Sequence, residues 1–195
     1  MLDTDRIIEI LGFTVGLFYL WYEYHASAKL WIASIIMPLI SMYLYFRKGI
    51  YADFAINIYY VIIAIYGYLA WTFGTRKQLK TGNVLRISHI NGKYLAHSAA
   101  VFAALWAGIF FVLAKYTDST VPVADAFTTA LSIVAMWMLA RKFIEQWLAW
   151  IAVDVVCVGL YAYKGLLFYP ILYAVYTVIA ILGYAKWRKL MAQGM

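Results

Sequence analysis

The sequence predicts an all-α integral membrane protein with seven transmembrane helices, arranged as two parallel three-helix repeats joined by a linker helix. Two observations carry this prediction. Of the 195 residues 66% are hydrophobic and only 13% are charged, with a mean hydropathy of +0.79, which is too apolar for a water-soluble domain. The chain also matches itself at a fixed offset, which indicates an internal repeat.

Seven apolar runs, separated by charged residues, are each long enough to cross a hydrocarbon layer of about 30 Å. They cover residues 7–24, 30–46, 52–73, 94–114, 122–140, 144–163 and 166–187. We expect a first repeat at 1–73, a solvated cytoplasmic loop at 74–93, a linker helix and its loop at 94–121, and a second repeat at 122–195. No room remains for a soluble domain, so function has to reside among the helices.

The basic residues predict the orientation of these spans. Eleven of the 16 Lys and Arg residues fall on the side that carries the 74–93 loop and the C-terminus. Because cytoplasmic loops retain Lys and Arg, we expect a cytoplasmic C-terminus and an N-terminus outside. The net charge of +7 resides in loops and helix ends, so no nucleic-acid surface is expected.

The internal repeat has an offset of 116 residues. It places Trp31 on Trp147 and Trp71 on Trp187, with 14 of 41 positions identical between these ends and no insertion. Glu9 also pairs with Asp125, so the repeat includes the first helix. Transporters built from parallel repeats bind substrate near the bilayer midplane between the two halves, which favours a small-solute transporter. A purely structural duplication, as in a channel or scaffold, is the alternative.

The sixth predicted helix carries the residues of most chemical interest. One face presents, at helical spacing, Trp147, Trp150, Asp154, Cys157 and Tyr161. A carboxylate at bilayer depth costs roughly 3 kcal/mol or more, so Asp154 is expected to face a wet cavity or a partner. A hydrogen bond that joins two helices is the alternative role.

Further candidate substrate-binding residues lie on the third and seventh helices. They are the hydrogen-bonding side chains Asn57 and Tyr60 in the first half, and Tyr173 and Tyr176 in the second. Asp154 stands where the first half has Pro38, which is expected to act as a hinge in the second helix. Such asymmetry between equivalent positions suits an asymmetric substrate.

The tryptophans have two interpretations. An aromatic belt at the membrane interface is the default for Trp21, Trp31, Trp71, Trp147 and Trp187, while a substrate site is equally open for Trp147 and is favoured for Trp150, one turn deeper. Metal-ligand spacing, a nucleophile motif and a phosphate loop are absent from the sequence, so neither an enzyme nor a bound metal or cofactor is expected. A membrane sensor is a weaker alternative.

Several motifs together resemble the PnuC family of vitamin transporters. They are residues 48–53 (KGIYAD) with Asn57 and Tyr60, 66–71 (YGYLAW), 145–154 (EQWLAWIAVD), 160–165 (LYAYKG) and 183–187 (GYAKW). The resemblance implies a SWEET-like fold, a homotrimer in a bacterial inner membrane, and facilitated diffusion of a B-vitamin that cytosolic phosphorylation then traps. It also gives Trp147 and Trp150 the role of stacking platforms and Asp154 that of a counter-charge for a cationic ring.

Two positions depart from the nicotinamide riboside carriers of that family. Asn57 stands where Gln is common, and Tyr68 stands where Trp is common after the glycine. The resemblance favours nicotinamide riboside as the cargo because that vitamin prevails in the family, and these departures keep thiamine as the alternative. A sugar carrier of the wider SWEET-like group also remains compatible with the repeat.

Overall fold

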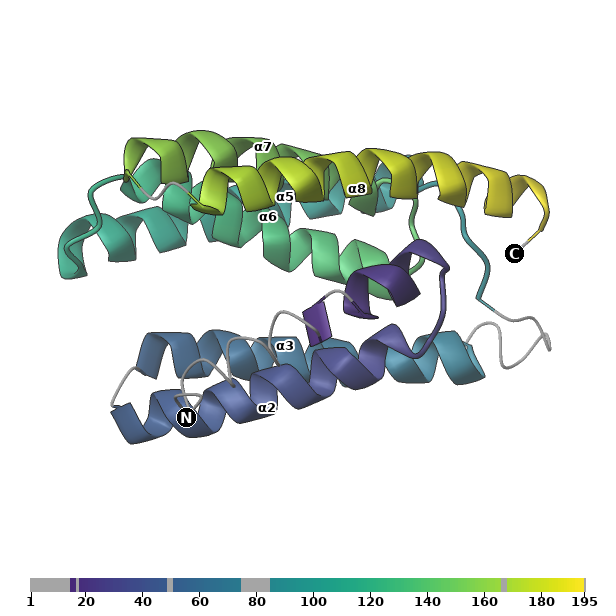
Figure 1. Cartoon of the computed structure of the whole chain (residues 1–195), viewed down its shortest axis with the longest axis horizontal. Helices are drawn as coiled ribbons and strands as arrows, with labels where there is room; N and C mark the ends of the chain where they lie inside the picture. Colours follow the sequence, from purple (N-terminus) through teal and green to yellow (C-terminus); the bar gives the residue numbers. More distant parts are fainter. Residues whose placement is uncertain (1–14, 17, 49–50, 75–84, 166–167, 195) are drawn as a thin grey trace. The chain divides into compact units, whose positions relative to one another are not determined.

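The computed structural model describes residues 15–194, without 17, 49–50, 75–84 and 166–167, and is helical through most of them (Figure 1). Residues 18–24 end a first helical segment. Six long helices follow: α2 (Leu30–Lys48), α3 (Tyr51–Phe73), α5 (Gly92–Tyr116), α6 (Pro122–Ala140), α7 (Gln146–Tyr163) and α8 (Phe168–Ala192). The predicted all-α architecture is confirmed.

Five of these helices are long and apolar enough to cross a membrane. The spans are Ile56–Phe73, Gly92–Tyr116, Pro122–Ala140, Gln146–Tyr163 and Tyr169–Ala192. The apolar part of α2 is shorter, Leu30–Tyr43, and most of the expected span 7–24 lies outside the described residues. Length and composition thus agree with a multi-pass membrane protein.

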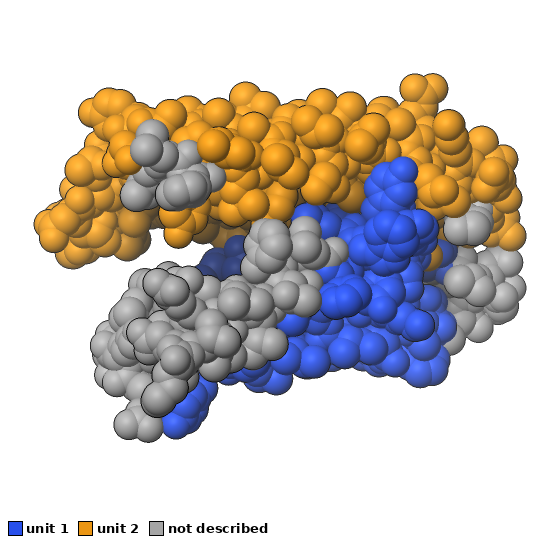
Figure 2. Space-filling view, in the orientation of Figure 1, with its two compact units in different colours: residues 1–85 blue, residues 86–195 orange. Residues whose placement is uncertain are grey.

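Two compact units divide the chain, Met1–Leu85 and Arg86–Met195 (Figure 2). In the first unit α2 packs along α3. In the second, α5 packs on α6, α6 on α7, and α7 on α8. The expected linker helix, α5, therefore belongs to the second compact unit.

The 116-residue offset also relates the backbone turns that precede α2 and α7. Ala26 and Lys142, equivalent by the offset, are the two described non-glycine residues with positive φ, at 52° and 54°. Equivalent hydrogen bonds close the two turns: Ser27 N–H to Tyr22 O and Ala26 N–H to Glu23 O in one, Phe143 N–H to Met138 O and Lys142 N–H to Leu139 O in the other, all 2.9–3.0 Å. This pattern ends a helix in a Schellman motif. Both halves reverse the chain in the same way.

Within each of the helix pairs α2–α3 and α7–α8, the two helices meet through an equivalent packing contact. Trp31 meets Trp71 edge-on, with ring centroids 5.6 Å apart at 86°, and Trp147 meets Trp187 at 5.7 Å and 87°. A glycine of the second helix lies under the first indole of each pair. The glycines are Gly67 under Trp31 and Gly183 under Trp147.

These contacts correct the expected aromatic belt. Trp31, Trp71, Trp147 and Trp187 are at most 4% exposed and lie inside the protein, not at a lipid interface. Trp21, 62% exposed, keeps the exposure that a belt residue needs. The sequence could not separate the two environments, because a protein interior and an interfacial lipid both accept an indole ring.

The described end of the predicted solvated loop is bound to the second unit. Residues 86–91, which we call the strap, lie along the turn between α6 and α7. Ser88 N–H donates to Lys142 O, and Ile144 N–H donates to Ser88 O, both at 3.1 Å. Ile87 is 4% exposed, whereas Arg86, Ser88, His89 and Asn91 are exposed, so one buried apolar side chain anchors an otherwise solvated segment.

Candidate functional site

Four of the five residues of the predicted α7 stripe, Trp150, Asp154, Cys157 and Tyr161, line the part of the helix beyond the buried Trp147. Asp154 and Cys157 are buried, and Trp150 and Tyr161 are half-buried. α7 begins directly after Glu145, whose carboxylate accepts the backbone N–H of Ile90 (2.9 Å) and lies 2.7 Å from His89 Nδ1. The strap therefore fixes the first turn of the helix that carries the stripe.

Asp154 is a buried carboxylate that lacks a polar partner in the described ranges. It is 6% exposed, and no hydrogen bond or ion pair joins it to a described residue. Cys157, Tyr173 and Tyr176 lie within its electrostatic reach. Because a buried charge needs a partner, Asp154 is suited to a cation that the described residues do not supply.

The tyrosines of α7 and α8 form a stacked group. Tyr161 lies between Tyr169 (ring centroids 5.1 Å apart, 25°) and Tyr173 (5.2 Å, 8°). Tyr176 meets Tyr173 edge-on at 5.8 Å. The structure thus brings Tyr161, Tyr173 and Tyr176 together, with Tyr173 and Tyr176 within electrostatic reach of Asp154, and adds Tyr169, which sequence reasoning missed.

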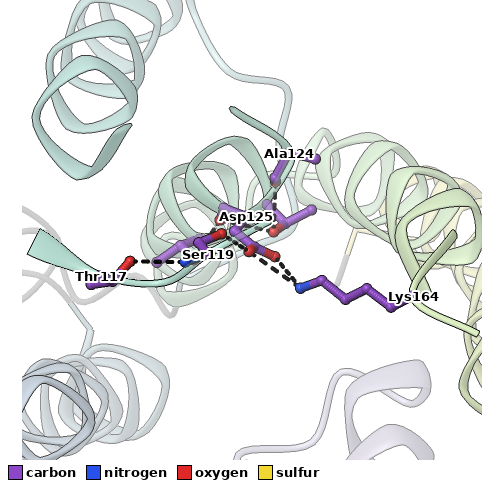
Figure 3. A network of polar contacts seen from close by, with 7 residues as sticks. Thr117, Ser119, Ala124, Asp125 and Lys164 are labelled. Carbon is purple, nitrogen blue, oxygen red and sulfur yellow. Dashed lines mark hydrogen bonds and ion pairs between the residues drawn. The ribbon is translucent and has the colours of Figure 1, made fainter. Parts of the chain in front are cut away.

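A charged cluster closes one end of the α6–α7 pair (Figure 3). Lys164 Nζ lies 3.0 and 3.2 Å from the two carboxylate oxygens of Asp125, and Ser119 Oγ donates to the same carboxylate at 2.7 Å. Lys164 also lies 5.9 Å from the centre of the Tyr161 ring. Glu9 and Lys48, which the repeat pairs with Asp125 and Lys164, lie outside the residues whose side chains are described.

The remaining candidates occupy different environments. Trp147 is 1% exposed, with Gly183 against its ring and Trp187 meeting it edge-on. Asn57 and Tyr60 are half-buried on α3 of the first unit, and the ring centroids of Tyr60 and Tyr59 are 5.7 Å apart. Pro38 lies within α2 of the same unit. These three residues belong to the first compact unit, whereas the α7 stripe belongs to the second.

Sequence reasoning also missed Gln146, the first residue of α7. Its side chain is 0% exposed, and neither amide atom has a hydrogen-bond partner among the described residues. A signal was available, because Gln146, Trp150 and Asp154 recur every four residues and so share a helical face. Within the described part of the chain, His, Cys, Asp and Glu side chains form no group that could hold a metal ion.

Comparison with known proteins decides the family. Residues 6–189 match the model of a family described as nicotinamide mononucleotide transporter. The chain belongs to this transporter family. The resemblance to PnuC proteins is thereby confirmed, and the protein is a multi-pass transporter of the inner membrane, not an enzyme.

Transporters from several bacteria are similar to this chain over most of its length. The nicotinamide riboside transporter PnuC of Escherichia coli is 24% identical over 92% of this chain and 84% of its own length. That of Neisseria mucosa is 27% identical over 82% of this chain and 65% of its own. The riboflavin/roseoflavin transporter RibM of Streptomyces davaonensis is 30% identical over 64% of this chain and 58% of its own.

The family fold is shared with a solved structure. The crystal structure of the vitamin B3 transporter PnuC superposes with a TM-score of 0.69 at 19% identity, covering 98% of this chain and 84% of that one. At this identity the likeness establishes the fold, whereas cargo has to be argued from the residues of the site.

Proposed function

We propose that this transporter takes up nicotinamide riboside by facilitated diffusion and that cytosolic phosphorylation traps the vitamin. Three relatives support a vitamin as cargo, two of them named for nicotinamide riboside. The single observation that carries the choice of cargo is Asp154. A carboxylate that is 6% exposed and has no described partner matches a cargo with a fixed positive charge, such as a pyridinium ring.

The aromatic residues around Asp154 support the same cargo. Trp150 lies one turn before it on α7, and Tyr173 and Tyr176 approach it from α8. Aromatic faces attract cations and stack on flat rings. We assign Trp150 and Asp154 the leading roles in binding, with Tyr161, Tyr173, Tyr176 and Trp147 of the same unit around them.

The first half contributes less charge and more flexibility in this proposal. Asn57 and Tyr60 supply hydrogen-bonding groups, and Pro38 acts as a hinge in α2. The transport unit consists of the repeats 1–73 and 122–195, in a homotrimer with the C-terminus in the cytoplasm. The excess of Lys and Arg at the C-terminal side supports this orientation.

Thiamine is the second candidate cargo, because its thiazolium ring also carries a fixed positive charge that Asp154 could balance. A sugar is less well matched, since an uncharged cargo leaves the carboxylate without a counter-charge. Riboflavin is supported only by the name of RibM. Its flavin ring is neutral, so it would also leave the Asp154 carboxylate without a counter-charge.

Liposomes that contain the purified protein test this proposal. We expect them to exchange labelled nicotinamide riboside in both directions without a sodium or proton gradient, and to accumulate it only when a kinase and ATP are enclosed. Asp154→Asn should lower exchange about tenfold or more, since truncating a buried charge pair costs about 2–5 kcal/mol. Asp118→Asn, the same change at an exposed loop acid, serves as the control.

Each outcome of this assay has one meaning. Exchange no faster than in empty liposomes refutes the proposed function. Faster exchange of thiamine than of nicotinamide riboside replaces the vitamin but retains the role of Asp154. Equal activity of Asp154→Asn and wild type removes the counter-charge role.

A further inference from the structure

The first residue of α7 is an unusual place for a polar side chain. Gln146 is 0% exposed, more completely buried than Asp154. Its amide nitrogen and its amide oxygen are both inaccessible, and neither makes a hydrogen bond with any residue in the described ranges. An amide buried in this way costs roughly 1–3 kcal/mol on the scale of protein mutations.

The repeat shows that packing does not require an amide here. The equivalent residue of the first half is Leu30, which is also 0% exposed and also begins its helix. The turns before the two residues have the same backbone hydrogen bonds: Leu30 N–H to Ser27 O and Gln146 N–H to Phe143 O are both 3.2 Å. An apolar side chain therefore satisfies this position of the fold, and the amide needs another explanation.

The neighbours of Gln146 point to a ligand. The indole N–H of Trp150 is likewise buried and unpaired among the described residues, and its equivalent in the first half is Ser34; the unpaired indole N–H of Trp147 recurs at Trp31 and belongs to the shared packing. Trp150 lies four residues and Asp154 eight residues beyond Gln146 on one face, a rise of about 12 Å between the ends. This face thus presents hydrogen-bonding groups at one end, an aromatic ring in the middle and a carboxylate at the other end.

We propose that Gln146 is a substrate-binding residue that hydrogen-bonds a neutral polar group of the cargo, a carboxamide or a sugar hydroxyl. The inference rests on the proposed function, because it assumes a cargo whose cationic ring faces Asp154. Gln146 offers both a donor and an acceptor, which such groups can match, whereas a second cation would leave the amide donors unpaired. A buried amide that binds a cargo group rejects analogues that lack this group.

The test compares the binding of whole and truncated cations to purified full-length protein. The ligands are nicotinamide riboside, the ribosyl pyridinium that lacks the carboxamide, and N-methylnicotinamide, which lacks the ribose. We expect Gln146→Leu to bind nicotinamide riboside about 10- to 100-fold more weakly than wild type. For one truncated cation, the one without the group that Gln146 binds, the two proteins should have equal affinity.

Two further variants keep the test decisive. Gln146→Leu reproduces the first half and removes an unpaired amide, so its melting temperature should equal or exceed that of wild type. Gln146→Met preserves side-chain length and should show the same loss of binding if the leucine variant does not fold. Leu30→Gln, the reverse change in the first half, should lower the melting temperature and leave the ratio of affinities for the three ligands unchanged.

The outcomes separate this inference from the proposed function. Wild-type protein that binds none of the three cations overturns both. Wild-type binding that Gln146→Leu leaves unchanged, or weakens by the same factor for all three ligands, overturns only the role of Gln146 and assigns its amide to buried water.

Discussion

The α2–α3 pair of the first unit and the α7–α8 pair of the second are joined by the same contact. In each pair a tryptophan near the start of one helix lies over a glycine of the next and meets a second tryptophan edge-on. The two halves differ at three positions along the first helix of each pair. The offset aligns Leu30 with Gln146, Ser34 with Trp150, and Pro38 with Asp154. The repeat thus retains the residues that pack the helices, whereas only the second half has an amide, an indole and a carboxylate at these three positions.

Because the contact is the same in both halves, replacing its glycine with alanine should lower the free energy of unfolding by a similar, large amount in each half. A Cβ atom on Gly183 would lie 2.6 Å from Cη2 of Trp147, and one on Gly67 would overlap the Trp31 ring. Both indoles are buried and cannot move aside without disturbing their partners. We expect Gly183→Ala and Gly67→Ala each to lower the free energy of unfolding by about 2–3 kcal/mol, measured in mixed detergent micelles.

Gly159→Ala is the matched control for this pair of substitutions. Gly159 lies within α7, and an added Cβ would meet nothing within 4 Å. Alanine is more favourable than glycine in a helix interior by up to about 1 kcal/mol, so this change should be neutral or stabilising. If Gly67→Ala proved as harmless as Gly159→Ala, the two halves would not share a packing contact, and the comparison would fail.

The sequence predicted what depends on composition and on local spacing. The apolar runs gave the helices, and the offset of 116 residues predicted equivalent positions that the turns at Ala26 and Lys142 reproduce in their backbone. The stripe with Trp150 and Asp154 followed from the helical period. All of these are properties of neighbouring residues or of the chain compared with itself.

Contacts between distant residues could not be predicted in this way. Glu145 binds Ile90, 55 residues earlier, and nothing in the polar composition of the loop indicates that its end returns to α7. Trp31 and Trp147 look like interfacial residues because lipid and protein interior are both apolar. The helical spacing places Gln146 on the face of Trp150 and Asp154, but only the structure shows that its amide is buried without a partner among the described residues.

The contact between Glu145 and the strap predicts a loss of stability of intermediate size, which has no counterpart in the first half. Glu145 accepts the N–H of Ile90 and contacts His89, whereas the equivalent residue of the first half, Lys29, is exposed and has no carboxylate to offer. Glu145→Ala should lower the free energy of unfolding by about 1–2 kcal/mol, because the Ile90 N–H loses its charged acceptor. Hydrogen exchange at Ile90 and Ile144 should accelerate as the strap opens.

Lys29→Ala provides the comparison for the strap. As an exposed residue it should change stability by no more than about 0.5 kcal/mol. Equal effects of the two alanine substitutions would mean that the strap does not hold α7 in place. Unchanged exchange at Ile90 in Glu145→Ala would carry the same meaning.

The smallest effects are expected at the two left-handed turn residues, where the halves agree in backbone and differ in charge. Ala26 and Lys142 have φ of 52° and 54°, a region in which a side chain is strained and glycine is not. Ala26→Gly and Lys142→Gly should each raise the free energy of unfolding by about 0.5–1 kcal/mol.

A pH titration of stability separates the two turns. Partial burial lowers the pKa of the Lys142 ammonium, so the unfolded chain binds this proton more tightly than the folded one. Stability should therefore rise with pH between the lowered folded pKa and the unfolded value near 10.5, and the penalty of burying the charge is fully present below that interval. Lys142→Gly should abolish this rise, and Ala26→Gly should retain it. A rise that persists in Lys142→Gly would assign the titration to another group and leave the two turns energetically alike.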